Sequence, residues 1–270
     1  MRLWVLALTI TCVAAVVPPS APAETRLDPV AALRVQLASG TGVTTTRVTV
    51  TQVPPDKPLM ARSSEVHEVA HGEVVASDIV RHLSGMTRGR LVLFPDRFYE
   101  QDTDQQPYLP AGKTWLTGKE DLTLALHCGA LRLSHPPTIK ALLALTRVKR
   151  PGGVYDGTRT TLHEGVITLG EAAKVDPELQ VFSHRPKVTE AQIPLRWKLW
   201  IGQDHLVRRC QSSYVLLDYV GWGGFDPMEV ADDVRLSRWG HAADIRPPAA
   251  DQVATLDELT FPDKVSADSP

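Results

Sequence analysis

The sequence predicts an α+β protein in which one large antiparallel sheet carries inserted helices. Residues 193–201 (IPLRWKLWI) place apolar side chains at every second position, as an antiparallel strand with one covered face requires. Residues 43–53 and 160–169 are rich in the β-branched residues typical of strands. Residues 135–153 (HPPTIKALLALTRVKRPGG) instead have the start, apolar body and Gly-Gly stop of a buried helix. Strands and helices do not alternate regularly, which argues against a parallel βαβ fold.

The first half of the chain is expected to open with a helix and to continue as strands. Asp28 suits the helix cap, Pro29 suits the first helical position, and Gly40 suits the stop. The strands expected after this helix are 43–53, a hairpin over 61–80 that turns at Gly72-Glu73, and 89–94.

The second half is expected to place two helices among further strands. The first helix covers about 137–147, and its apolar side chains occupy more than one face, so it must be buried against the sheet or against a ligand. A second, short helix is expected at 169–177. A turn at 202–204 leads from the strand at 193–201 into another strand, and the Gly-rich residues 218–226 are expected to form a loop.

The chain is expected to end at a sheet edge. Residues 238–253 (RWGHAADIRPPAADQV) predict a strand that ends at Trp239-Gly240 and a second short strand over 242–245. Pro247-Pro248 stops the pairing, because proline cannot donate to a sheet ladder. A short helix through about Leu259 is expected to close the fold.

Both ends of the chain are predicted to lie outside one folded domain. Residues 1–23 have one cation, an apolar run and the small-x-small pattern of a secretory signal peptide, with an uncleaved anchor as the alternative. Cys12 raises the further alternative of an acylated lipoprotein, although Thr11 is a poor match before such a cysteine. Residues 24–260 are then a single domain and 261–270 a flexible tail. We therefore expect a secreted or extracytoplasmic protein that is soluble after signal cleavage.

Charge and cysteine content limit the partners. The chain carries 29 Lys and Arg against 31 Asp and Glu. This mixed charge argues against a nucleic-acid partner, which needs a concentrated basic face. Cys128 and Cys210 lie beyond the predicted signal, and two alternatives remain open for them: a disulfide, or two buried thiols.

HEVAH at 67–71 matches the H-E-x-x-H pattern, in which His67 and His71 would bind zinc and Glu68 would act as the general base. The third histidine of a metzincin is missing, since Val74 and Ser77 occupy the positions of its extended motif. The surrounding alternation predicts a strand, in which the two histidines lie about 13 Å apart, too far for one zinc. We therefore expect two histidines on a solvated strand face and no metal site.

No other catalytic or cofactor signature is present. The chain has no G-x-S-x-G elbow, no P-loop and no G-x-G-x-x-G. We therefore expect no catalytic residue, no cofactor and no enzymatic activity.

Four segments, in this order along the chain, resemble the extracytoplasmic LolA-like lipid carriers, and in particular the actinobacterial LppX/LprG-type lipoproteins. Unlike many of those relatives, this chain has no convincing lipobox, which favours a diffusible carrier or a secreted sensor. The resembling segments are EVVASDIVRHLSGMTRGRLVLFPDRFYEQ at 73–101 with PAGKTWL at 110–116, the residues 136–175, PLRWKLWIGQDHLVRRCQSSY at 194–214, and SRWGHAADIRPPAADQVATLDEL at 237–259.

The resemblance implies a strongly curved antiparallel sheet, an incomplete β-barrel, with helices packed in its concave face. It also implies an apolar space between helices and sheet that holds the acyl chains of lipids. Combined with the alternation above, it indicates a lipid-binding lining formed by Ile139, Leu142, Leu143 and Leu145 from the helix and by Leu195, Trp197 and Leu199 from the strand.

The leading functional hypothesis is therefore a non-enzymatic, secreted binding protein that holds a lipid or another apolar small molecule. The alternative is a cell-envelope interaction or sensor module of the same fold, with a filled core and a protein partner. A zinc metalloprotease is the least favoured hypothesis. In each case we expect a monomer.

Overall fold

The computed structural model describes residues 28–53, 56–83, 89–102, 106–179, 181, 186–221 and 224–260. The predicted signal peptide, Cys12 and the predicted tail lie outside these described residues. Within them, no helix is both long and apolar enough to cross a membrane.

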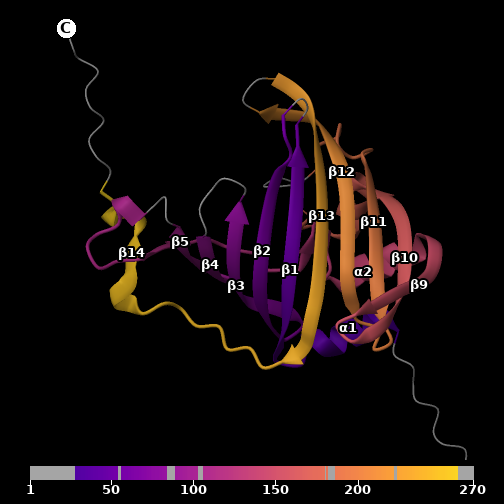
Figure 1. Ribbon diagram of the computed structural model, residues 1–270, viewed down its shortest axis with the longest axis horizontal. Helices are drawn as coiled ribbons and strands as arrows, with labels where there is room; N and C mark the ends of the chain where they lie inside the picture. Colours follow the sequence, from indigo (N-terminus) through magenta and orange to yellow (C-terminus); the bar gives the residue numbers. More distant parts are fainter. Residues whose placement is uncertain are drawn as a thin grey trace, which may run out of the picture.

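In the part of the chain that the structure describes, one curved sheet of twelve strands dominates the fold (Figure 1). The strand order is β14-β6-β5-β4-β3-β2-β1-β13-β12-β11-β10-β9, and within the described chain the edge strands β14 and β9 do not pair, so the sheet stays open. All neighbours are antiparallel except β14 and β6. The sheet confirms the predicted fold class.

Several strands match the segments that the sequence predicts. β11 matches the segment of strict alternation, and β2 and β3 form the predicted hairpin. The strands are β1 (Thr41–Gln52), β2 (Leu59–Ala70), β3 (Glu73–Leu83), β4 (Gly89–Phe94), β5 (Arg97–Asp102), β6 (Trp115–Lys119), β9 (Thr146–Tyr155), β10 (Thr158–Thr168), β11 (Pro194–Gly202), β12 (Val207–Gly221), β13 (Gly224–His241) and β14 (Val253–Thr255).

Three α-helices contribute to the core that covers one face of the sheet, which we call the inner face: α1 (Pro29–Leu37), α2 (Pro136–Ala144) and α3 (Leu169–Val175). Their ends have local causes. The Asp28 carboxylate accepts the Ala31 N–H at 2.8 Å and caps α1, as the sequence predicts. Thr168 and Glu171 form a capping box at the start of α3.

The helix predicted over 137–147 ends earlier, at Ala144. Thr146 and Val148 pair with β10 as part of the edge strand β9. Strand pairing of these β-branched residues therefore takes precedence over continuation of the helix.

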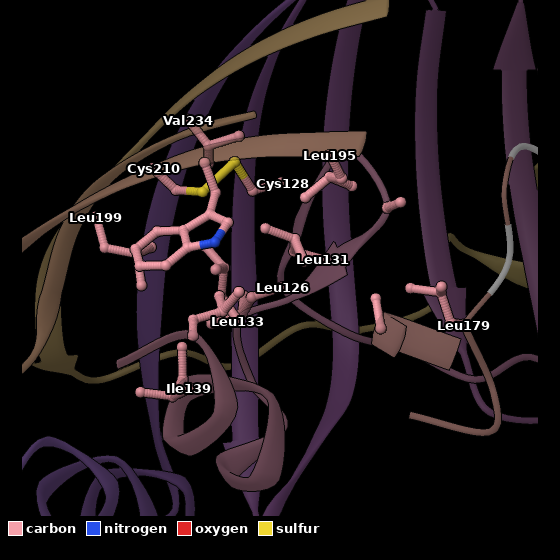
Figure 2. Close-up of a cluster of buried hydrophobic side chains, with 14 of the residues drawn as sticks. Leu126, Cys128, Leu131, Leu133, Ile139, Leu179, Leu195, Leu199, Cys210 and Val234 are labelled. Carbon is pink, nitrogen blue, oxygen red and sulfur yellow. A yellow bond between two sulfur atoms is a disulfide. The ribbon is translucent and has the colours of Figure 1, made fainter. Parts of the chain in front are cut away.

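A small hairpin of β7 (His127–Cys128) and β8 (Leu131–Arg132) packs into the inner face (Figure 2). Cys128 forms a disulfide with Cys210 of β12, so of the two alternatives for these cysteines the pairing is confirmed. Gly129 makes the close approach of the hairpin turn possible, because its φ is +55° and a Cβ there would lie 2.5 Å from the Ser212 hydroxyl. Arg132 adds a bidentate ion pair to Asp176 after α3, at 2.6 and 2.7 Å.

The core lies between this hairpin, the helices and strands β10–β13. Trp197 is its largest side chain, and it is 1% exposed. Figure 2 shows α2 contributing Ile139 to the same cluster as the hairpin residues, the disulfide and β11. The apolar side chains labelled there are Leu126, Leu131, Leu133, Ile139, Leu179, Leu195, Leu199 and Val234.

The chain end differs from its prediction. Residues 242–249 do not form the predicted strand. In place of the predicted closing helix, the described chain has two 3-10 turns, η2 (Ala250–Gln252) and η3 (Leu256–Glu258), which flank β14. The segment crosses to the other end of the sheet, where β14 pairs in parallel with β6 (Figure 1). Ile245 packs there beside Val92 and Tyr99. The two prolines permit this extended crossing, since it needs no ladder hydrogen bonds.

The Gly-rich residues 218–226 were expected to form a loop, and this is wrong for most of them. The backbone of β12 continues to Gly221, and β13 begins at Gly224. Cross-strand pairing, with Val220 opposite Phe225, extends the ladder almost to the turn.

Candidate ligand-binding cavity

A cavity of about 570 Å³ lies on the inner face of β1–β4, beside the core described above. Segment 123–127, which leads into the β7–β8 hairpin, forms its opposite wall. This volume falls within the range of small-molecule sites, about 300–1,000 Å³. We call this space the inner cavity.

Apolar side chains form one part of the inner cavity. Ile79 of β3 lies opposite Leu91 of β4, and Leu93 continues the same face two residues further along β4. Leu124 and Ala125 approach from the opposite wall. Successive side chains of a strand point to opposite faces. Leu91 and Leu93 therefore lie on the inner face of β4 and Val92 lies on the outer one.

A buried polar network forms the floor of the inner cavity. His67 of β2 contacts the Glu65 carboxylate through Nε2 at 3.0 Å and the Ser77 hydroxyl through Nδ1 at 2.9 Å. Thr45 and Ser63 donate to the two oxygens of Glu65 at 2.9 and 2.5 Å. The Glu65 carboxylate and the His67 imidazole are therefore both buried with hydrogen-bond partners.

The network fixes the roles of the His67 nitrogens. An ionised carboxylate only accepts hydrogen bonds, so Nε2 donates to Glu65, and in a neutral ring Nδ1 then accepts from Ser77. The same order of serine, histidine and acid orients the nucleophile in serine hydrolases. Here both Ser77 and His67 are only 2% exposed, and Glu65 also binds Thr45, Ser63 and His67. We therefore interpret the network as a buried polar floor.

Arg47 extends the polar floor toward the core. Its Nε lies 3.4 Å from Glu65 Oε1, and its Nη2 donates to the His127 carbonyl at 3.1 Å. Burial alone would raise the pKa of Glu65, but the hydrogen bond from His67 and the charge of Arg47 hold that pKa well below its usual value of 4.5. Burial, together with the Arg47 and Arg132 cations, lowers the pKa of the His127 ring from 6.5 to about 4.

The polar side chains reach β13 and separate the inner cavity from the closed core. Thr49 donates to the buried carboxylate of Asp232 at 2.6 Å. Burial raises the pKa of Asp232 despite this hydrogen bond. A polar band therefore runs across the inner face from Ser77 on β3 to Asp232 on β13, and the apolar cavity wall and the core lie on its two sides.

Folding stability is expected to fall as the pH drops from 6.5 to 4. The unfolded chain protonates His127 below 6.5, whereas the folded chain does so only near 4, so this ring alone removes about 2–3 kcal/mol over the interval. Glu65 acts in the same direction below 4.5, and Asp232, whose pKa is raised, acts in the opposite direction. Urea unfolding across this pH range, with His127→Gln beside the unchanged protein, measures the effect. An equally steep pH dependence in the variant would contradict the assignment.

The structure confirms the strand predicted around His67 and corrects the expected placement of both histidines of the HEVAH motif. His67 lies in strand β2, as predicted, but it is buried in the polar floor and not on a solvated face. His71 falls in the hairpin turn with a φ of 55°. Glu68 faces the outer side and accepts the Ile245 N–H at 3.2 Å. Among the described residues no cluster of three His, Cys, Asp or Glu side chains can hold a metal, and a strand cannot present the motif as a helix does.

The predicted lining residues lie outside the inner cavity. Ile139, Leu142, Leu195, Trp197 and Leu199 are all buried in the closed core, and Leu143 packs against it half-buried. Leu145 does not join them, which corrects the expectation that it is buried: α2 ends before it, and its side chain is 41% exposed.

The residues of the inner cavity were missed by sequence reasoning for a definite reason. Strands β1 to β3 carry polar side chains on both faces, so alternation alone does not say which of their faces is covered. One feature of the sequence could have located the polar floor of the inner cavity. Glu65 and His67 are two residues apart and therefore lie on the same face of a strand. Besides Arg47, two further basic side chains lie at the same cavity, Arg62 and Arg81.

Comparisons with known proteins match solved structures only. No family model and no curated protein sequence matches the chain. The solved structures that are similar to it include the following two. A LolA superfamily protein from Nitrosomonas europaea aligns with 80% of this chain and 93% of its own, at 7% identity and a TM-score of 0.27. A DUF1329 family protein from Desulfovibrio piger aligns with 78% of this chain and 92% of its own, at 13% identity and a TM-score of 0.25. At such scores neither alignment carries an argument about function.

Proposed function

We propose that this protein is a non-enzymatic, extracytoplasmic carrier that holds an apolar small molecule, such as a lipid chain, in the inner cavity. The observation that carries the proposal is the cavity of about 570 Å³ with the apolar wall of Ile79, Leu91 and Leu93. Transfer of apolar ligand surface from water into such a site gains about 25 cal/mol per Å². The extracytoplasmic location is supported by the predicted signal peptide at 1–23. The resemblance to LppX/LprG-type lipoproteins agrees with lipid binding.

The inner cavity supports this function better than the predicted lining does. The space between α2 and β11 is occupied by the β7–β8 hairpin, whose Leu131 and Cys128 are at most 1% exposed. A ligand there would have to displace packed side chains and strain the disulfide. The inner cavity needs no such rearrangement.

A second candidate function is an envelope interaction or sensor module, which binds a protein partner and no small ligand. The filled core around Trp197 is the observation that favours it. The two candidates differ in one property: only the carrier needs the inner cavity to be accessible to an apolar molecule.

An apolar fluorescent probe tests the carrier function. Ala61 of β2 lines the inner cavity, so Ala61→Trp is expected to occupy part of the space and weaken probe binding by about tenfold or more. The matched control is Ser64→Trp, which places the same side chain on the outer face of β2, since the exposed Ser64 lies between Ser63 and Glu65, which line the inner cavity. Equal probe affinity in both variants, or no binding by the unchanged protein, would overturn the proposal in favour of the module.

A further inference from the structure

The end of α2 and the edge strand β9 form a segment of the chain without acidic residues. Residues 136–155 contain Lys140, Arg147, Lys149 and Arg150 and not one Asp or Glu, although the whole chain has a net charge of −2. β9 is the last strand of the sheet, so one of its edges has no neighbour in the described chain. In Figure 1 it lies at the opposite end of the sheet from β4, β5 and β14. We call residues 140–154 the basic edge.

The cations of the basic edge are largely unpaired. Lys140, Arg147 and Lys149 are exposed, and within the described part of the chain none of the three has an ion pair. Arg150 is the exception, since it binds Glu164 at 2.7 Å. Their charge therefore remains available to a negatively charged partner.

Apolar side chains are exposed among these cations. Leu145 is 41% exposed, Val148 is 43% exposed and Val154 is 64% exposed. A row of unpaired cations on an edge strand is a common guard against aggregation. Protection against aggregation does not explain why exposed apolar residues lie between the cations, because such residues raise the tendency to associate. The combination instead resembles that of proteins that lie on a membrane surface.

We propose that the basic edge docks on an anionic lipid bilayer. Lys140, Arg147 and Lys149 would attract the headgroups, and Leu145 and Val148 would enter the boundary between headgroups and acyl chains. A polyanion such as DNA would satisfy the charges but would leave both apolar side chains in water, so the bilayer accounts for more of the surface. This docking is separate from ligand binding, because no residue of the basic edge lines the inner cavity.

Sedimentation with vesicles tests the docking. The purified protein is expected to bind vesicles of phosphatidylglycerol and phosphatidylcholine mixed, and to leave pure phosphatidylcholine vesicles unbound at low salt. Arg147→Glu combined with Lys149→Glu should weaken binding by about tenfold or more, since each surface cation contributes about fivefold. The matched control is Lys57→Glu combined with Lys119→Glu, which reverses two exposed cations, one in the connection between β1 and β2 and one in β6. Urea midpoints confirm that both double variants are folded.

The apolar contribution separates a bilayer from a polyanion. Leu145→Ser combined with Val148→Ser should lower vesicle binding severalfold and leave any binding to double-stranded DNA unchanged. Loss of vesicle binding in the Lys57/Lys119 control to the same extent would overturn the proposal, because general charge would then explain the attraction. The proposal would also be overturned if the serine substitutions left vesicle binding unchanged and the protein bound DNA as tightly as vesicles. The basic edge would then be a polyanion site. Probe binding in the inner cavity should stay unchanged in the Arg147/Lys149 variant.

Discussion

Replacement of Trp197 by alanine is expected to lower the free energy of unfolding by about 3–5 kcal/mol. The indole is 1% exposed and packs in the core between β11, α2 and the β7–β8 hairpin. Its Nε1 is buried and has no hydrogen-bond partner in the described chain, so the loss comes from packing and from the cavity left behind.

Urea unfolding of three variants measures this effect. Trp197→Phe keeps an aromatic ring in place and should cost clearly less than Trp197→Ala. Val188→Ala changes a side chain that is 92% exposed and should stay within about 0.5 kcal/mol of the unchanged protein. A loss below about 1 kcal/mol for Trp197→Ala would show that the core is not packed around this residue.

Removal of the disulfide is expected to have the second largest effect. Cys128 and Cys210 are 82 residues apart, and in the chain-entropy model a loop of this length contributes about 4 kcal/mol. The double variant Cys128→Ala with Cys210→Ala should therefore unfold at a much lower urea concentration. The free energy of unfolding that the double variant loses should equal the loss that a thiol reductant causes in the unchanged protein.

The reductant also supplies the control for the disulfide. The double variant has no bond to reduce between these positions, so its midpoint should not move when the reductant is added. A midpoint of the unchanged protein that is insensitive to reductant under unfolding conditions would contradict a stabilising bridge. Because the bridge holds the hairpin that follows segment 123–127, we also expect reduction to weaken probe binding in the inner cavity.

Local patterns were sufficient to predict the fold class, an α+β protein with a large antiparallel sheet and inserted helices. The strict alternation of 193–201 predicts β11, and Asp28, Pro29 and Gly40 mark the ends of α1 within about two residues. These signals act within a few residues of where they occur, through a cap, a turn or the two-residue repeat of a strand. They do not depend on which segments meet in space.

The sequence did not indicate where the inner cavity lies or how the chain ends, since both depend on distant segments. Strand β2 is polar on both faces, and its inner face is decided by segment 123–127, some 60 residues away. Leu145 lies outside the core because β9 begins at the next residue. Residues 242–249 cross the outer side of the sheet to reach β6, a partner that local propensity cannot identify.

Native mass spectrometry of the purified protein tests the carrier account most directly. We expect a bound apolar molecule that raises the mass of the unchanged protein and of Ser64→Trp, and that is lost or strongly reduced in Ala61→Trp. Mild organic extraction should release the same molecule. A protein that carries no apolar molecule, takes none up from added lipid, and behaves identically in all three forms would contradict the account.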